Sequence, residues 1–295
     1  MTLDTPADAD EVAARAAKAA GVVVRELGSL AELAAAIGVF DRIWAPDTGN
    51  SSIRLDLLRA LTKAGNYASG AYDVTSGALL GACVGFFGPP ADAELHSHIA
   101  GVVPGGLGRS VGFALKVHQR AWCLRRGVRV VAWTYDPLIR RNAYFNLVKL
   151  GARPVEYLRN FYGVMDDAIN SGTESDRVLV HWDLRSVTAT DASAGNPRPA
   201  SFNDERASGA VVALAIGADG GPVAEPALAG GSGARGFLVG VPADIEAMRL
   251  SDPALAATWR AALRDVLSPL LSSGARVTGF DRSGWYVIST SVTKG

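Results

Sequence analysis

The sequence has little cysteine, no net charge and no long apolar run, and each shortage excludes a class of protein. Only two of the 295 residues are cysteine, and Cys83 and Cys123 lack the spacing of metal ligands or of a disulfide framework. Lys and Arg number 29, as do Asp and Glu, so no charge-driven attraction to nucleic acid or to an anionic membrane surface is expected. The apolar runs are too short to span a bilayer, and the acidic start MTLDTPADADE is unlike a secretory signal. We therefore expect a cytoplasmic protein whose two cysteines are buried and reduced.

Close to half of the residues are apolar, which is enough for more than one domain. The first twenty residues are expected to be frayed or loosely helical. After them, β-branched runs alternate with stretches of helical period, which predicts a mixed α/β fold. The expected strands are 21–27, 67–73, 78–87, 94–103, 128–135, 155–162 and 178–184, and the expected helices are 29–43, 53–63, 110–126 and 139–150. On the helix at 110–126, the periodicity places Lys116, Gln119, Arg120 and Arg126 opposite the apolar face.

A segment rich in Ser, Thr, Ala, Asn and Pro at 185–208 predicts a linker. It separates a domain at 21–184 from a smaller α/β region at 209–295. In that region we expect strands near 210–216, 236–241, 276–280 and 285–290, and a long helix capped by Asp252 with Pro253 at its first position.

The most informative stretch is HIAGVVPGGLGRSVGFALK at 98–116, where a Gly-rich turn joins a strand to a helix. Such a turn leaves backbone N–H groups pointing outward at the positive end of the helix, which favours binding of a phosphate without a basic side chain. The turn does not match G-x-G-x-x-G or a Walker loop, so a dinucleotide or a nucleoside triphosphate is not indicated.

Several motifs in order give the chain a resemblance to a known family. VVP at 102–104 and LGRSVG at 107–112 are followed by WTYDPL at 133–138 and NAYFNLVKLGA at 142–152. Over about 21–184 this order resembles the GNAT (Gcn5-related N-acetyltransferase) superfamily, in particular predicted acetyltransferases with a W-T-Y/F-D-P-L segment and an extra C-terminal region. The resemblance implies a GNAT-like mixed twisted sheet flanked by helices, and acetyl-CoA or another acyl-CoA as co-substrate, with no metal. The cofactor-binding residues that it implies are Val102, Val103, Leu107, Gly108, Arg109, Ser110, Val111, Gly112 and Asn142.

Two departures from the family pattern are visible. Leu107 stands where the family has Arg or Gln at the head of the phosphate loop, and Ser110 stands where it has the first Gly. Arg109 could supply charge there. Leu147 stands where the family often has a Tyr that protonates the departing thiolate. Either Tyr144, Tyr157 or Tyr162 takes that role, with Tyr162 as our candidate, or the thiolate leaves unassisted.

Glu94, His96 and His98 alternate on one predicted strand, so the three side chains face one way. The resemblance places His96 and His98 where related acetyltransferases have a glutamate base or a His-x-His pair. A histidine with a pKa near neutrality can accept the proton that an amine must lose before it attacks a thioester. The alternatives are a solvated strand face, a hydrogen-bonded core pair, or a metal site, which would need ligands from elsewhere.

Other polar residues have plainer interpretations. His118, on the apolar face of its helix, is expected to be a satisfied core histidine, and His181 a structural one. Asp136, Arg140 and Arg141 follow a strand near the expected reaction site, where they bind an acidic acceptor or coenzyme phosphates, or form a solvated loop. Asn142 matches the family's contact to the pantetheine arm; the alternative is a helix N-cap.

Two functions are compatible with these patterns. The first is an acyl-CoA-dependent N-acyltransferase, most simply an acetyltransferase, acting on a small-molecule amine, with a homodimer left open. The second is a non-catalytic module that binds CoA or a partner on a degenerate GNAT scaffold, as Leu107, Ser110 and Leu147 suggest. A short self-similarity between 151–164 and 274–288, both starting Gly-Ala-Arg, indicates either a degenerate second half-domain in the C-terminal region or convergence of two helix–Gly–strand junctions.

Overall fold

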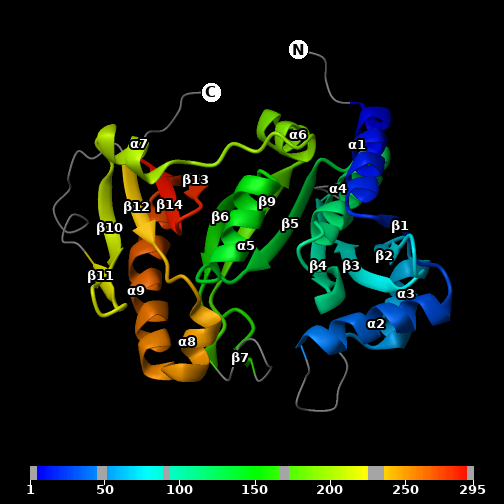
Figure 1. Cartoon of the computed structure of the whole chain (residues 1–295), viewed down its shortest axis with the longest axis horizontal. Coiled ribbons are helices and arrows are strands. Elements are labelled where there is room, and N and C mark those ends of the chain that lie inside the picture. Colours follow the sequence, from blue (N-terminus) through cyan, green and yellow to red (C-terminus); the bar gives the residue numbers. More distant parts are fainter. Residues whose placement is uncertain (1–4, 45–51, 89–93, 166–172, 225–235, 291–295) are drawn as a thin grey trace. The chain divides into compact units, whose positions relative to one another are not determined.

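The computed structural model describes residues 5–44, 52–88, 94–165, 173–224 and 236–290 (Figure 1). The chain forms two compact units. The first comprises residues 1–133 and 182–194, and the second comprises residues 134–181 and 195–295. Strands β5 (Val130–Tyr135) and β9 (Arg177–Asp183) each run from one unit into the other.

The first unit is a sheet with helices packed on it. Its strands lie in the order β1-β2-β3-β4-β5; successive neighbours are antiparallel except β4 and β5, which are parallel. The remaining bounds are α1 (Pro6–Ala19), β1 (Val22–Glu26), α2 (Leu30–Trp44), α3 (Leu55–Lys63), β2 (Tyr67–Asp73), β3 (Leu79–Phe87), β4 (Glu94–Val102), a 3₁₀ turn η1 (Pro104–Gly106), α4 (Val111–Arg125) and α6 (Val187–Ser193). The sheet is therefore mixed, as predicted for the fold class.

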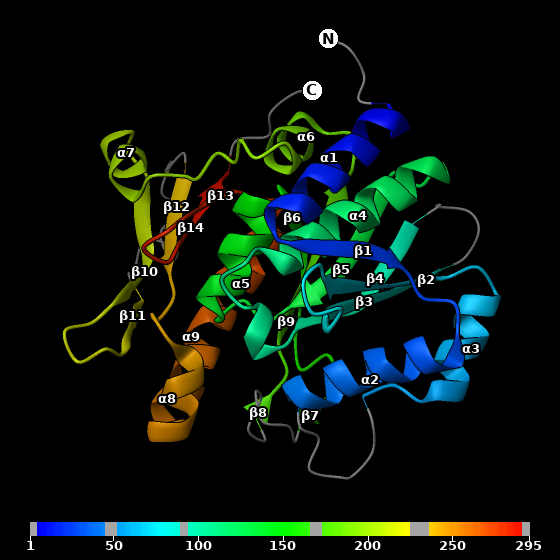
Figure 2. The ribbon, with the colours of Figure 1, turned by 45° about the vertical axis from the view of Figure 1, so that its right-hand side comes forward.

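Helices α4 and α2 pack on opposite faces of β3 and β4, and α1 lies beside α4 (Figure 2). A Cβ atom on Gly81 would lie 3.1 Å from Leu115 of α4, and one on Gly101 would lie 2.5 Å from Ile43 of α2. Both helices thus approach the strands closely because glycine offers no side chain at these points. This close packing fixes α4, and with it the Gly-rich turn, against β4.

Strand β4 carries a β-bulge in its middle. Val84 of β3 lies opposite Ile99, whereas the next residue, Gly85, lies opposite Ser97, so His98 is the extra residue. A Cβ atom on Gly85 would meet the carbonyl oxygen of His96 at 2.9 Å, which explains the glycine at this position. A bulge bends the strand and re-aims the side chains around it.

The second unit contains the pair β6 (Arg153–Leu158) and β9, and a separate sheet in the order β11-β10-β12-β14-β13. The strands of that sheet are β10 (Val211–Ile216), β11 (Pro222–Ala224), β12 (Gly236–Gly240), β13 (Arg276–Asp281) and β14 (Trp285–Ser289). The unit also has α5 (Arg140–Tyr144), a π-helical turn η2 (Phe145–Lys149), the short pair β7 (Val164–Met165) and β8 (Thr173–Glu174), α7 (Phe202–Ala207), α8 (Ile245–Ser251) and α9 (Pro253–Ser272).

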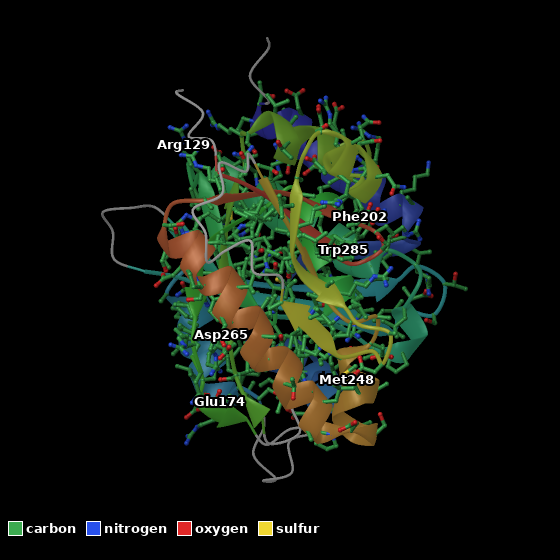
Figure 3. All side chains as sticks on the ribbon, turned by 90° about the vertical axis from the view of Figure 1, so that its left-hand side faces the viewer. Arg129, Glu174, Phe202, Met248, Asp265 and Trp285 are labelled. Atoms are coloured by element: carbon green, nitrogen blue, oxygen red, sulfur yellow. The ribbon has the colours of Figure 1, made fainter. Side chains whose placement is uncertain are left out.

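Helix α9 packs on β10, β11, β12 and β6. Figure 3 shows its length, with Asp265 on it, and shows Phe202 of α7 close to Trp285 of β14. The rings of Phe202 and Trp285 are 4.6 Å apart between centroids. As expected, Asp252 caps α9, accepting from the Leu255 N–H at 3.0 Å.

The predicted order of strands and helices is confirmed, and the expected C-terminal strands form a sheet of their own. One local expectation was wrong. Residues 6–19 are a regular helix, because Thr5 and Asp8 form a capping box. The segment 185–208, expected as a linker, contains α6 and α7, capped by Ser186 and Ser201. The bounds of the compact units differ from the expected bounds at 184 and 209.

Of the four polar residues expected opposite the apolar face of the α4 helix, only Arg126 is exposed. Lys116, Gln119 and Arg120 are buried, at 4%, 0% and 0% exposure. The helix is covered by the sheet and by α1, so little of its surface faces water. The polar side chains are accommodated by hydrogen bonds instead: the guanidinium of Arg120 donates to the Leu184 carbonyl at 2.9 Å. In the part of the chain that the structure describes, no helix is long and apolar enough to cross a membrane.

Candidate functional site

The Gly-rich turn after β4 presents backbone amides at the start of α4. The first hydrogen bond into the helix runs from the Ala114 N–H to the Ser110 carbonyl at 3.0 Å. The N–H groups of residues 111–113 therefore precede the helical ladder and point out of the helix end. Leu107, Gly108 and Ser110 are exposed at this end, while Val111 is buried and fixes the helix to the core. The predicted residues of the phosphate turn thus lie together at an accessible helix N-terminus.

Two residues of the turn have left-handed backbone conformations. Gly108 has φ of 76° and Ser110 has φ of 62°. Alternation of left-handed and right-handed residues turns successive N–H groups toward one point and forms a concave anion site. The position of Ser110 therefore needs the conformation that the family's glycine adopts freely, and a serine adopts it at a cost of about 1 kcal/mol.

Arg109 is held by the protein itself. Its guanidinium donates to the Asp73 carboxylate at 2.7 Å and to the carbonyl oxygens of Ala20 and Gly21 at 3.3 and 3.2 Å. Hydrogen bonds from Ser76 and Arg109 lower the pKa of Asp73, so this carboxylate stays charged. Arg109 therefore anchors the turn to the edge of the sheet, and the turn offers an anion mainly its amides.

Strand β4 pairs with β5 over only a short stretch of the described residues. Glu94, Leu95 and His96 pair with residues 130–132, and within the described residues no further β4–β5 pair follows. Val102, by contrast, pairs with Gly81 of β3, and the Val103 N–H donates to Leu80 at 2.9 Å. From Ser97 onward, no described residue of β5 pairs with this edge of β4.

The two histidines meet at the bulge. The rings of His96 and His98 lie 6.3 Å apart between centroids, and both contact Phe86, at 5.1 and 5.7 Å. The prediction that they share a face is confirmed. Burial lowers the pKa of both imidazoles, and the charges of His98 and Lys116 lower that of His96 further. Glu94, at the start of the same strand, is half-buried.

Beneath the bulge, on the face of the sheet that α4 covers, lies a buried polar cluster that the sequence did not reveal. The Lys116 ammonium donates to Ser97 Oγ at 3.1 Å and to Gln119 Oε1 at 2.6 Å. It also lies 3.9 Å from the ring centroid of Trp133. Burial lowers the pKa of Lys116 from its ordinary value to about 8. Ser97 thus joins the histidine-bearing bulge to a lysine of α4.

Asn142, Leu147 and the candidate tyrosines belong to the second unit. Asn142 is the third residue of α5, where Ile139 is the N-cap, so the N-cap alternative was wrong. Leu147 is buried in the π-helical turn and supplies no acid.

Among the tyrosines, Tyr157 is buried, which raises its pKa, and its hydroxyl donates to Asp176 at 2.7 Å, which raises that pKa further. Tyr162 is 43% exposed, with its hydroxyl 3.1 Å from Thr134 Oγ1 at the end of β5. Tyr144 is half-buried. Of the three tyrosines, Tyr162 is the most exposed.

Asp136 is neither a ligand group nor part of a solvated loop. It is 4% exposed, and it accepts from Arg260 at 2.8 and 2.6 Å and from Arg249 at 2.5 Å. The nearby Tyr286 hydroxyl donates to the Pro137 carbonyl at 2.7 Å. The WTYDPL segment therefore anchors α8, α9 and β14, a role that needs the distant arginines and so was not visible in the motif.

The remaining candidates are two histidines and the two cysteines. His118 Nδ1 lies 2.9 Å from the Tyr67 hydroxyl, and burial lowers the pKa of this imidazole to about 4, so it is the core histidine that was predicted. His181 is half-buried on β9. Cys83 and Cys123 are free and buried. Across the described ranges, no three His, Cys, Asp or Glu side chains are grouped so as to hold a metal ion.

Similar solved structures are N-acetyltransferases. The ribosomal-protein-S18-alanine N-acetyltransferase from Escherichia coli has a TM-score of 0.45 and 14% identity, covering 56% of this chain and 96% of its own. The ribosomal-protein-S5-alanine acetyltransferase from Vibrio fischeri has a TM-score of 0.45 and 14% identity, and the match covers 55% of this chain and 92% of that protein. A candidate acetyltransferase from Salmonella typhimurium, solved with its cofactor acetyl-CoA, has a TM-score of 0.45 and 15% identity. This match covers 56% of this chain and 95% of that protein. No protein-family model and no curated sequence matches the chain.

Proposed function

We propose that this chain is a GNAT-type enzyme that transfers an acyl group, most simply acetyl, from CoA to the amine of a small molecule. The observation that carries the proposal lies within the first unit: one strand, β4, bears a histidine pair at a bulge and leads directly into an accessible amide turn at the head of α4. This order supplies an anion site and a proton acceptor on a single strand–turn–helix element.

The pyrophosphate of the acyl-CoA would lie on the amides of residues 108–112, where the helix end favours negative charge. The pantetheine arm would pair with the backbone of residues 100–103 along the edge of β4. A backbone N–H of β4 would stabilise the oxyanion of the tetrahedral intermediate, because it is fixed before the charge develops.

His96 or His98 would accept the proton of the attacking amine, directly or through water. Lowered pKa values keep both imidazoles neutral at neutral pH, which is the form that can accept a proton. Glu94 could pass the proton onward. In the second unit, Asn142 would contact the pantetheine arm, and Tyr162 would protonate the leaving thiolate.

The C-terminal region, residues 209–295, would bind no coenzyme. The residues before α9 form a side-chain cap at Asp252, without a Gly-rich turn. We propose that it is a degenerate GNAT-like half.

Binding of CoA tests the placement of the anion site. Gly112→Asp should abolish the thermal stabilisation by CoA, because it adds a negative charge beside the pyrophosphate. The matched control is Gly112→Ala, since a Cβ atom there would meet only Val102, at an ordinary 3.7 Å. If Gly112→Asp folds and binds CoA as well as the parent, the site lies elsewhere.

Turnover separates the two candidate functions. CoA release would be measured with acetyl-CoA and a panel of small amines. Release that depends on an amine supports the enzyme. CoA binding without release across the panel favours the non-catalytic module, which the exposed Leu107 and the buried Leu147 also support.

A further inference from the structure

Lys116 is an unusual residue for its location. It is 4% exposed, lies between α4 and the sheet, and within the described part of the chain forms no ion pair with a carboxylate. Its hydrogen-bond acceptors are two neutral oxygens, and its remaining neighbours are the indole rings of Trp133 and Trp182, at 3.9 and 5.6 Å. An apolar side chain of the same length would fill this volume without burying a charge.

Further buried polar groups surround Lys116 and form hydrogen bonds with one another. Gln119 is fully buried, accepts from the lysine and donates to Cys83 Sγ at 3.5 Å, while the Cys83 sulfur lies 3.8 Å from Ser97 Oγ. Three elements, α4, β3 and β4, therefore meet in one buried polar network. A buried polar network specifies one arrangement of its members, because any displacement leaves a group without its partner.

The location of the network links it to the proposed site. Ser97 lies opposite Gly85 at the bulge, between His96 and the extra residue His98. The recorded pairing with β5 ends at His96, one residue before the serine that Lys116 holds, and Trp133 follows the last paired residue of β5. Lys116 also belongs to the same helix whose first turn presents the anion-binding amides.

We propose that Lys116 is a positioning residue of the acyl-transfer site, which fixes Ser97 from beneath β4 and thereby sets the bulge that carries His96 and His98. The catalytic part of this inference rests on the proposed function, but the hydrogen bond between Lys116 and Ser97 is a property of the fold. The lysine touches neither substrate nor coenzyme; it acts through the strand.

The surroundings of His96 make the effect of Lys116 measurable. Its own strand carries Glu94 and His98, and β3 contributes Phe86. Helix α2 contributes Ile43 and Trp44 to the same face of β4. Helix α4 contributes Lys116 from the other face. Removal of the lysine charge should therefore move the His96 titration midpoint to higher pH, and release of Ser97 should shift the amide resonances of residues 97 and 98.

The test compares Lys116→Met with Lys116→Arg, Ser97→Ala and a control, Lys63→Met, which removes an exposed lysine of α3. The imidazole resonances are titrated by NMR in the whole chain, and the amide resonances are recorded at one pH. We expect Lys116→Met to raise the His96 midpoint and shift the amides, Ser97→Ala to shift the amides with a smaller change of midpoint, Lys116→Arg to keep the midpoint, and the control to change neither.

Kinetics supply the second measurement. In Lys116→Met we expect kcat with acetyl-CoA to fall at least tenfold while the CoA affinity stays within twofold of the parent. An unchanged His96 midpoint together with unchanged amides at 97 and 98 would overturn the proposal, as would a loss of activity explained by CoA affinity alone. If Lys116→Met does not fold, the Arg and Ser97 variants decide. If the parent neither binds CoA nor releases it in the presence of an amine, the proposed function fails. The NMR resonances of His96 and of residues 97 and 98 then still show whether Lys116 holds Ser97.

Discussion

The guanidinium of Arg109 donates a 2.7 Å hydrogen bond to the carboxylate of Asp73, which joins the Gly-rich turn to the end of β2. The same nitrogen also reaches the carbonyl oxygens of residues 20 and 21, just before β1. A charged side chain in a phosphate turn invites the interpretation that it binds the phosphate. Its partners show that it instead joins the turn to the end of β2 and to the residues before β1.

This arrangement predicts that Asp73→Ala and Arg109→Ala weaken CoA binding to a similar extent. Both should also destabilise the fold, with a favourable coupling in a double-mutant cycle, because the two side chains hydrogen-bond directly. Urea unfolding and CoA titration of the two single variants and the double variant give these quantities. If Arg109 instead bound phosphate directly, Asp73→Ala would free it and strengthen CoA binding, the opposite result.

Ser110→Gly should stabilise the protein by about 1 kcal/mol, since glycine adopts the left-handed conformation at this position without strain. The Ser110 side chain makes no capping hydrogen bond, so Ser110→Ala should leave the stability nearly unchanged and serves as the control. Thermal unfolding of both variants measures the difference. Equal effects of glycine and alanine would mean that φ at this residue is not strained.

Much of the architecture was predictable because it follows from local patterns. The Gly-rich turn, the periodicity of the helix behind it and the alternation at Glu94, His96 and His98 each lie within a few residues of sequence. The bulge at His98 was not predictable, since it depends on how β3 and β4 are aligned across the sheet.

The surroundings of two charged residues, Lys116 and Asp136, were predicted wrongly from the sequence. Lys116 falls on the polar side of a helical projection, yet it is buried, because α1 and the sheet both cover α4. Asp136 follows a strand end where acceptor-binding residues were expected, and its partners Arg249 and Arg260 lie more than a hundred residues later. A pairing over that distance leaves no trace in local composition.

The histidine pair should set the acidic limit of catalysis. Because the pKa values of His96 and His98 lie below the ordinary 6.5, the neutral, proton-accepting form persists below that pH. We therefore expect the acidic limb of kcat/KM in the parent to fall below pH 6.5. His96→Ala or His98→Ala should lower turnover most above the histidine pKa, where the parent's imidazole is neutral and the amine is still protonated, with a smaller change in CoA affinity. Unchanged pH–rate profiles in both variants would assign the pair a purely structural role.

Asp136→Asn should destabilise the second unit by about 3–5 kcal/mol, because it leaves the buried guanidinium of Arg260 without its counter-charge. The pKa of Asp136 is lowered by these arginines against the effect of burial, so the carboxylate is charged at neutral pH. Urea unfolding followed by tryptophan fluorescence measures the loss. Glu156→Gln, at an exposed position of β6, is the control and should change stability by under about 0.5 kcal/mol. Similar small losses in both would show that the ion cluster contributes little.

Lys116 gives a prediction for the pH dependence of stability. Its pKa is about 8 in the folded chain and 10.5 when exposed. Below pH 8 both states carry the charge, and the folded state bears the cost of burying it. Between pH 8 and 10.5 the folded lysine is neutral while the unfolded one still binds a proton, so the parent gains stability as the pH rises. Relative to Lys116→Met, the parent should gain about 3 kcal/mol between pH 7 and 11, since every other titrating group is common to both proteins. Urea unfolding of the two proteins across this range measures the difference, and a difference independent of pH would mean that Lys116 is not held in an environment that disfavours its charge.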